Sequence, residues 1–403
     1  MRSTGPQTAR AAAPLVSVVM ANYQAGDKLV PAIESVLGQT LADIELIVCD
    51  DASGDHSVAL VEQFMRADPR VSLIKAPANG GPARCRNRGL AAARGQWIAV
   101  VDADDIIHPE RFERLLAAAA HSGADIVADD LLHFYEDGSP VSLLLGAEQD
   151  SLFAVTTEQW IGAGFDGSAP LGYLKPLIRA DMLGALRYDE SLRIGEDFDL
   201  VLRLLLAGAT MVVLPEPYYL YRRHSGSISH RLSVTDLAAM LDSQHAMTLR
   251  LGALSPPLAA AFAARHAQLQ HGLAFERLVA AIKGRKPAQA LSLLARHPRL
   301  ALRLGRAFIE GRRRSVAAPG LSPVNALQLG PSGLRVPDYV RVADMDWAAP
   351  RPRQAWRDLA DLGRGHPIDV VCPDKASRYA AGFIPLARLR EPVSRAHLRA
   401  EVS

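Results

Sequence analysis

Short apolar runs alternate with amphipathic stretches over the first hundred residues. The runs are rich in β-branched residues, as expected of strands that are buried on both faces. Between them apolar residues recur at helical spacing, as at Leu29, Ile33 and Val36 after a candidate helix cap, Asp27. Strands alternating with helices at these short spacings predict a parallel sheet covered by helices. We expect strands over 15–20, 44–49, 71–74 and 97–101, and helices over 27–37, 57–65 and 82–93.

The regular alternation of strand and helix patterns ends after residue 105. Residues 140–180 are irregular and rich in glycine and aromatic residues, which predicts a substrate-binding insert rather than core. From 237 to about 314 the chain is mostly Ala, Leu and Arg interrupted by prolines, which predicts several short helices. The remaining elements that we expect are helices over 112–120 (opened by Pro109) and 196–206, and strands over 124–128, 211–214 (with 218–221 as an extension) and 368–372.

These patterns divide the chain into four parts. We expect a disordered lead-in over 1–13, an α/β domain over 14–232, a helical basic region over 233–315 and an irregular region over 316–403. The lead-in has no apolar segment, so we do not interpret it as a secretory signal. No apolar run reaches the roughly 18 residues of a membrane span.

Charge and cysteine content restrict the partners and the compartment. The formal net charge is +2, which gives no reason to expect a nucleic-acid partner. Residues 277–314, however, hold eleven Lys or Arg and one acid, Glu310. Such a stretch can lie on an anionic bilayer, or it can be an Arg-faced helical subdomain packed on the α/β domain. Three cysteines far apart indicate no disulfide framework and hence a cytoplasmic protein, with the inner face of the cytoplasmic membrane as a further location.

The strongest chemical signal follows the strand at 97–101. Asp102, Asp104 and Asp105 come directly after it, at the edge where open α/β sheets bind ligands. Crowded carboxylates repel one another unless a positive charge lies among them. A divalent cation, Mg²⁺ or Mn²⁺, with a diphosphate as its other ligand meets that need. The alternative is that these acids only end a strand and cap the next helix.

Other strand ends carry polar residues too. Asn22 follows the first strand, Asp50 and Asp51 follow the second, a Gly-rich segment over 80–89 enters a helix, and Glu196-Asp197 begins a later one. Each has a plain alternative as a turn residue, a helix cap or an ordinary first-turn acid. Their joint order and spacing are much harder to obtain by accident.

In this order the motifs resemble glycosyltransferase family 2, inverting enzymes with a GT-A fold. The matching text is S-V-V-M-A-N-Y, I-E-L-I-V-C-D-D-A-S-G-D, N-G-G-P-A-R-C-R-N-R-G, V-D-A-D-D and G-E-D-F-D-L-V-L-R-L, within residues 14–232. Within the family, G-Y-L-K-P-L-I-R-A, L-R-I-G-E-D-F and S-G-S-I-S-H-R resemble bacterial succinoglycan-type exopolysaccharide transferases. The resemblance implies a GT-A domain with a mainly parallel sheet, followed by a helical and irregular C-terminal region.

The resemblance also assigns roles. Asp51, with Asp50, would bind the uracil or ribose of a sugar nucleotide, and Asn22 and Arg86 match further positions of the nucleotide-sugar site. Asp102 and Asp104 would meet ribose and metal, with Asp105 beside them. Asp197 would be the general base and Glu196 would orient the acceptor or the base.

Physical chemistry supports the role of Asp197 and points to further candidate residues. A base must be ionised at neutral pH, and the first turn of a helix favours Asp197 as an anion. Arg222, Arg223 and His224 follow an aromatic run and could stabilise the charge of a departing diphosphate, with 225–229 as a closing loop. The alternative for them is a solvated basic loop. Lys175 is a further candidate, near the acceptor.

The expected activity is transfer of one hexose, since neither Q-x-x-R-W nor the membrane helices of processive members are present. The default donor is UDP-glucose, and the expected acceptor is a lipid-linked saccharide. A catalytically silent nucleotide-sugar-binding scaffold protein is the alternative from another class. A nucleotidyltransferase is a second enzymatic alternative, but it would need a Gly-rich basic loop after the first strand, which A-N-Y-Q-A-G does not supply.

Overall fold

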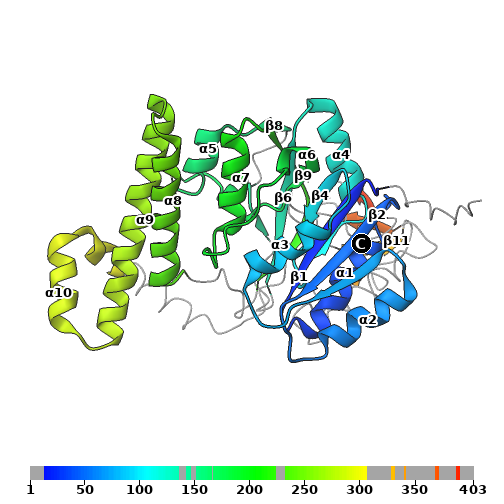
Figure 1. Cartoon of the computed structure of the whole chain (residues 1–403), viewed down its shortest axis with the longest axis horizontal. Coiled ribbons are helices and arrows are strands. Elements are labelled where there is room, and N and C mark those ends of the chain that lie inside the picture. Colours follow the sequence, from blue (N-terminus) through cyan, green and yellow to red (C-terminus); the bar gives the residue numbers. More distant parts are fainter. Residues whose placement is uncertain are drawn as a thin grey trace, which may run out of the picture.

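The computed structural model describes residues 13–135, 142–146, 151–165, 167–223 and 232–305, and the backbone of four short strands further along the chain. One large sheet flanked by helices accounts for most of these residues (Figure 1). Its strands are β1 (Val16–Asn22), β2 (Ile44–Asp50), β3 (Val71–Lys75), β4 (Trp97–Val100), β5 (Ile106–Ile107), β6 (Ile126–Tyr135), β7 (Ser142–Leu143), β8 (Phe153–Ala154), β9 (Leu177–Arg179) and β10 (Met211–Arg223). The helices are η1 (Gly26–Lys28), α1 (Leu29–Leu37), α2 (Ser57–Ala67), α3 (Pro82–Ala92), α4 (Arg111–Ser122), α5 (Thr157–Gly162), η2 (Leu171–Tyr173), α6 (Ala180–Leu183), α7 (Glu196–Leu206), α8 (Val234–Leu251), α9 (Pro256–Lys283) and α10 (Pro287–Arg296).

The first four strands pair in parallel in the order β3-β2-β1-β4, which confirms the interpretation of the alternating pattern. The register sets Asn22 opposite Asp50 at the carboxyl ends of β1 and β2. Residues that follow these strands therefore lie along one edge of the sheet. The expected helix cap is wrong: Asp27 belongs to η1 and contacts His56, and no side chain caps α1.

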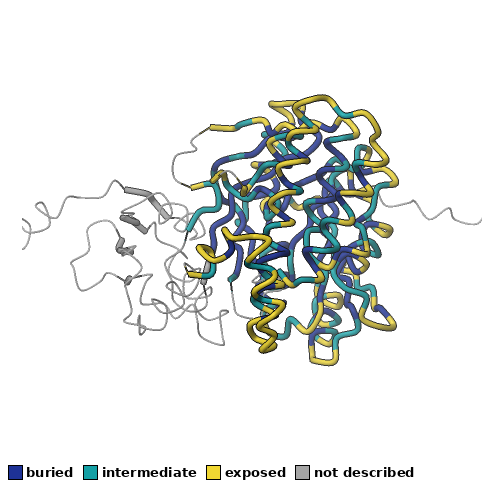
Figure 2. The backbone as a smooth tube through the Cα atoms, turned by 90° about the vertical axis from the view of Figure 1, so that its left-hand side faces the viewer, coloured by how far each residue is buried: buried dark blue, intermediate teal, exposed yellow. Residues whose placement is uncertain are grey.

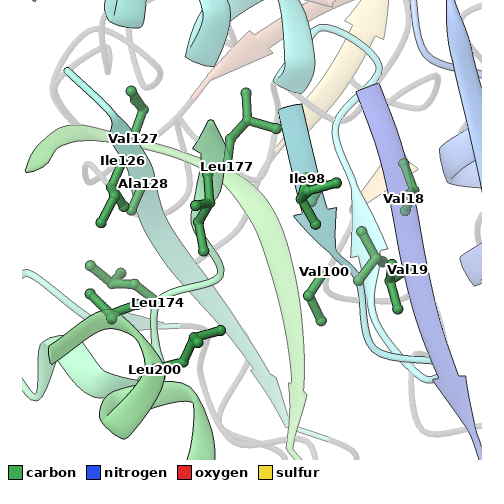
Figure 3. Close-up of a cluster of buried hydrophobic side chains, with 14 of the residues drawn as sticks. Val18, Val19, Ile98, Val100, Ile126, Val127, Ala128, Leu174, Leu177 and Leu200 are labelled. Carbon is green, nitrogen blue, oxygen red and sulfur yellow. The ribbon is translucent and has the colours of Figure 1, made fainter. Parts of the chain in front are cut away.

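Several described residues within 140–180 belong to the core, against our expectation of an insert outside it. Strand β9 lies antiparallel between β4 and β6, and Leu177 at its start is fully buried. Figure 3 shows Leu177 between Ile98 of β4 and Val127 of β6. A three-residue strand presents too short a pattern to be recognised in sequence, and Gly-rich surroundings conceal it further.

Strand β10 is continuous and long, so the segment at 218–221 is confirmed as an extension of the one at 211–214. It runs parallel to β6, with register shifts around Pro217, and its far end also pairs with β5. This course places Tyr219 and the residues after it against the acidic segment 102–105. Helix α4 begins at Arg111, two residues later than Pro109, because Pro109 and Glu110 form a turn.

Within 237–305 the short α10 agrees with the expectation of several short helices, whereas α8 and α9 are longer than expected. Pro256 and Pro257 occupy the first turn of α9, where proline is tolerated, so they start this helix rather than interrupt it. Met247 of α8 and Phe262 of α9 are buried in the same core as the sheet. The helical region therefore packs on the α/β domain, whereas α10 lies at the far end of α9, away from the sheet (Figure 1). Figure 2 shows the buried chain concentrated in the sheet and the helices against it.

The four remaining strands form a small sheet of their own, β12-β11-β13-β14. They are β11 (Gln328–Pro331), β12 (Val340–Arg341), β13 (Ile368–Val371) and β14 (Ala387–Arg390), and β13 coincides with the strand expected there. The others were not foreseen, because strands of two to four residues leave no clear periodicity. Among the described residues, no helix has both the length and the apolar character needed to cross a membrane.

Candidate active site

The carboxyl ends of the central strands carry the candidate residues. Asn22 ends β1, Asp50 ends β2 and Asp102 follows β4 by two residues. Asn22 Nδ2 donates to Asp50 Oδ2 at 2.7 Å, and Asn22 Oδ1 is buried without a hydrogen-bond partner among the described residues. A buried acceptor without a partner costs free energy, so this oxygen is suited to receive a donor group from a ligand.

Asp51 is 2% exposed and its carboxylate is occupied by the protein. Its Oδ2 accepts from the backbone N–H groups of Gly80 (2.9 Å) and Gly81 (2.8 Å), and its Oδ1 accepts from Arg88 Nη1 (3.0 Å). These contacts fix the loop that leads into α3. Asp51 thus shapes this part of the edge, and its direct contact with the nucleotide stays a prediction.

Asp105 also faces inward. Its Oδ2 accepts from the Tyr219 hydroxyl (2.8 Å) and its Oδ1 from the Arg222 backbone N–H (2.8 Å). Burial, followed by the charges of Asp104 and Asp102, raises the pKa of Asp105 well above its usual range. Both carboxylate oxygens of Asp105 accept hydrogen bonds from the protein and tie β10 to the segment after β4. The expected contact of Asp105 with a metal stays a prediction.

Five charged residues from four separate parts of the chain meet at the centre of this edge. Arg86 of α3 donates from Nη1 to Glu196 Oε1 (2.5 Å) and, more weakly, to Asp197 Oδ1 (3.3 Å), and from Nη2 to Asp102 Oδ1 (2.7 Å). Lys175 Nζ lies 2.8 Å from both Asp102 Oδ2 and Asp197 Oδ2. We call these five residues the charge cluster. It contains three carboxylates and two cations.

Local structure explains how α7 delivers its two acids to the cluster. Gly195 adopts a left-handed conformation (φ 88°) immediately before the helix, so Glu196 and Asp197 occupy the first helical turn. The positive end of the helix dipole favours anions there. About a fifth of the side chain is exposed in both Asp197 (19%) and Asp102 (22%), so both remain accessible to a ligand.

The two acids of α7 have different pKa values. Burial alone would raise the pKa of Asp197, but the charges of Arg86 and Lys175 outweigh it and lower the pKa. Burial, together with the charge of Asp197, raises the pKa of Glu196. The two cations beside Asp197 therefore favour its ionised form, which a general base requires.

The basic residues after the aromatic run are only partly described. Arg222 is buried, and its Nε donates to the backbone oxygen of Asp104 at 2.8 Å. Arg223 stacks on the rings of Tyr173 (5.3 Å) and Tyr221 (5.4 Å). His224 and the loop 225–229 lie outside the described residues. Arg222 thus reaches the acidic segment through the backbone, while Arg223 packs on aromatic faces.

The acids suit a metal ion that arrives with a ligand. Within the described ranges, no three His, Cys, Asp or Glu side chains are grouped so as to hold a metal. Both oxygens of Asp102 pair with cations of the charge cluster. Mg²⁺ commonly takes one or two carboxylates and completes its shell with phosphate oxygens and water. The donor set fits that mode, in which the half-buried Asp104 would be the protein ligand.

Sequence reasoning found the acids but missed some of their partners. Tyr219 and Arg88 were not singled out, although each holds an acid of the edge. Lys175 was placed near the acceptor, and the structure sets its ammonium between Asp102 and Asp197. A lysine in a mostly apolar segment was the only local signal, because its partners lie 22 or more residues away.

Comparison with known sequences gives consistent matches. Residues 17–167 match the family model described as "Glycosyl transferase family 2". The chain is 37% identical over 314 residues to the succinoglycan biosynthesis protein ExoO of Rhizobium meliloti (strain 1021), covering 77% of this chain and 89% of that protein. It is 31% identical over 219 residues to the glycosyltransferase GlyG of Streptococcus pneumoniae serotype 4, covering 53% and 72% of the two chains.

Among solved structures, the fold is similar to S. aureus TarS (residues 1–349) in complex with UDP-GlcNAc. The TM-score is 0.51 and the sequence identity is 19%, over 69% of this chain and 79% of that chain. At this level of identity the likeness concerns the fold alone.

Proposed function

Because the chain belongs to glycosyltransferase family 2, we propose that it transfers one sugar from a nucleotide diphosphate sugar to an acceptor hydroxyl, with inversion at the anomeric carbon. The GT-A fold expected from the sequence is confirmed. The observation that carries the mechanistic proposal is the place of Asp197 in the first turn of α7, in contact with Arg86 and Lys175, the two cations that also contact Asp102.

In the proposed reaction Asp197 accepts the proton of the acceptor hydroxyl. The acceptor oxygen bonds to the anomeric carbon as the bond from this carbon to the diphosphate breaks, and the nucleoside diphosphate leaves. A single in-line displacement converts an α-linked donor into a β-linked product. Glu196, whose pKa is raised, serves to orient the acceptor or the base. Asn22 and Asp50 would contact the base or ribose of the nucleotide, and Asp102 the ribose.

The leaving group needs stabilisation because negative charge grows on it in the transition state. Bound Mg²⁺ or Mn²⁺ would supply a Lewis acid at the diphosphate, and Asp104 would hold it. Arg222 and Arg223 lie on the strand that borders this segment, and His224 follows them in sequence. We propose that these residues assist departure of the diphosphate.

The substrate class is proposed from the relatives. Two of them are named for succinoglycan biosynthesis and one for teichuronic acid biosynthesis. We infer that this enzyme also builds a bacterial polysaccharide and that its acceptor is a lipid-linked oligosaccharide in the cytoplasm. UDP-glucose is the default donor.

A lipid-linked acceptor makes contact with the membrane surface useful. Residues 277–305, the end of α9 with α10 and the short helical segment after it, contain seven Lys or Arg and no acid. We call this segment the basic hairpin. Three of its apolar side chains are exposed: Ile282 (46%), Leu291 (67%) and Leu302 (71%). We propose that the basic hairpin rests on the anionic inner face of the cytoplasmic membrane.

A panel of UDP-, GDP- and dTDP-sugars tests the proposed activity. Release of nucleoside diphosphate from at least one of them in Mg²⁺ or Mn²⁺, with water or added oligosaccharide as acceptor, is the expected result. A wild type that binds UDP but releases no product from any donor would favour the scaffold protein instead.

Titration calorimetry tests the role of Asp104 separately from turnover. UDP should bind more tightly with Mn²⁺ than with a chelator, and Asp104→Ala should remove that difference because the protein ligand is lost. Equal UDP affinity of the wild type in Mn²⁺ and in chelator would contradict metal-assisted binding. Asp181→Ala, a substitution of an exposed acid on α6, is the control.

A further inference from the structure

Lys175 is anchored more firmly than an ordinary surface lysine. Its residue is 6% exposed and lies between the buried Leu174 and Leu177. Its backbone oxygen accepts from Arg111 Nη2 at 2.5 Å, and Arg111 itself is fully buried against Asp129. The main chain is therefore fixed from within the core, which directs the side chain to one place.

The distances within the charge cluster show which carboxylate each of its two cations contacts most closely. Arg86 makes its short contacts with Glu196 (2.5 Å) and Asp102 (2.7 Å), and its contact with Asp197 is long (3.3 Å). Lys175 supplies the short contact with Asp197, at 2.8 Å. Asp102 would thus keep a cation without Lys175, whereas Asp197 would keep only the weaker one.

We propose that Lys175 is a positioning residue for the transfer reaction: its ammonium fixes the carboxylate of Asp197 relative to Asp102, and so relative to the donor sugar. This inference rests on the proposed function and extends it, since neither Arg86 nor the helix end alone holds Asp197 in place. Lys175 acts through Asp197 and takes no proton from the acceptor. Without substrate its ammonium links Asp102, the proposed ribose contact, to Asp197, the proposed base.

A lysine that merely compensates buried charge would behave differently. Its removal would weaken folding and nucleotide binding together, because Asp102 and Asp197 would both be left without it. A positioning role affects turnover selectively, since a displacement of about 1 Å at a reacting group can lower a rate by roughly 100-fold. The separation of turnover from nucleotide affinity therefore distinguishes the two roles.

The test compares Lys175→Met and Lys175→Arg with the wild type. Turnover is measured as nucleoside diphosphate release from the sugar nucleotide that the wild type uses best, and affinity is measured with UDP by calorimetry. We expect Lys175→Met to lower kcat by about 100-fold while the Kd for UDP changes less than about threefold. Lys175→Arg keeps the charge and should recover about a tenth of the wild-type kcat or more, although its geometry differs.

The matched control is Arg94→Met, which removes a cation that pairs with Glu45 near the opposite end of the sheet. Arg94→Met should leave both kcat and the Kd for UDP unchanged. Thermal unfolding confirms that each variant is folded. A Lys175→Met kcat within threefold of the wild type would overturn the inference. So would joint loss of turnover and UDP binding, or a Lys175→Arg variant no better than Lys175→Met. A wild type inactive with every donor would instead contradict the proposed function.

Discussion

Asp102 and Asp105 are three residues apart, yet their pKa values move in opposite directions. Burial would raise both, but Asp102 faces Lys175 and Arg86, whose charges lower its pKa overall. Asp105 has a hydroxyl and a backbone N–H as partners, and two neighbouring carboxylates raise its pKa further. The two acids of this motif therefore have different roles. Asp102 is stabilised as an anion at the ligand-binding edge, and Asp105 joins β10 to the segment after β4.

Asp130 of β6 provides a test of buried-acid electrostatics away from the site. It is fully buried, its Oδ2 has no partner among the described residues, and burial raises its pKa to about 7. An unfolded aspartate titrates near 3.9, so the folded protein binds the extra proton between these values and loses stability as pH rises. Asp130→Asn abolishes this titration.

We therefore expect Asp130→Asn to gain stability relative to the wild type by about 1.4 kcal/mol for each pH unit between pH 5 and pH 7. Urea unfolding at pH 5, 6 and 7 measures the difference. Asp181→Asn, on an exposed acid, controls for the change of charge. A difference that stays constant over this range would show that Asp130 is ionised in the folded protein throughout.

At the scale of the elements, the position of α3 determines that of Arg86. Gly89, one turn after Arg86, faces the sheet, where an added Cβ would stand 2.4 Å from Val19 Cγ1 and 3.0 Å from Cys49 Sγ. The close approach of helix and sheet depends on the missing side chain.

Gly89→Ala should therefore lower the free energy of unfolding by about 1–3 kcal/mol through overpacking, despite the better helix propensity of alanine. Displacement of α3 would also move Arg86 and reduce turnover. Gly162→Ala is the matched control, because a Cβ there meets nothing within 4 Å. Chemical denaturation measures the loss of stability, and the nucleotide release assay measures the loss of turnover. A Gly89→Ala variant as stable as the wild type would mean that α3 can move away from β1 at no cost.

The parallel half of the sheet was predictable because each of its strands is a mostly apolar run followed by a helical pattern. The acids of the site were predictable because they stand next to one another in sequence. Lys175 as a partner of Asp197 was not predictable, since their contact depends on β9 lying between β4 and β6, and that three-residue strand gives no periodic signal. Contacts between residues that are far apart in sequence can be identified only when the three-dimensional fold is known.

At the scale of the whole molecule, the basic hairpin stands at one end of the structure and the charge cluster lies at the sheet. Helices α8 and α9 pack on the α/β domain through Met247 and Phe262, and α10 has no fully buried residue. The first part of α9 is thus attached to the α/β domain, whereas α10 lies beyond it as a surface helix.

Vesicle flotation tests the membrane proposal. The protein should float with phosphatidylglycerol vesicles at low salt and not at about 1 M salt, because screening shortens the reach of the basic charges. Leu291→Glu combined with Leu302→Glu should lower the bound fraction roughly tenfold or more through lost apolar contact and added repulsion. Leu249→Glu changes a leucine of α8 that is equally exposed (69%) and should not matter. Failure of the folded wild type to float at low salt would leave α10 as an ordinary surface helix.

The central claim is that Asp197 is the base of a glycosyl transfer. Asp197→Asn keeps the size of the side chain and removes the proton acceptor, so it tests this claim most directly. The measurement is the rate of nucleoside diphosphate release at saturating donor, with UDP affinity determined in parallel. The account predicts a loss of about 100-fold or more in rate, the usual contribution of a general base, with UDP affinity nearly unchanged. A variant that keeps the wild-type rate, or that loses UDP binding while turning over normally at saturation, would contradict it.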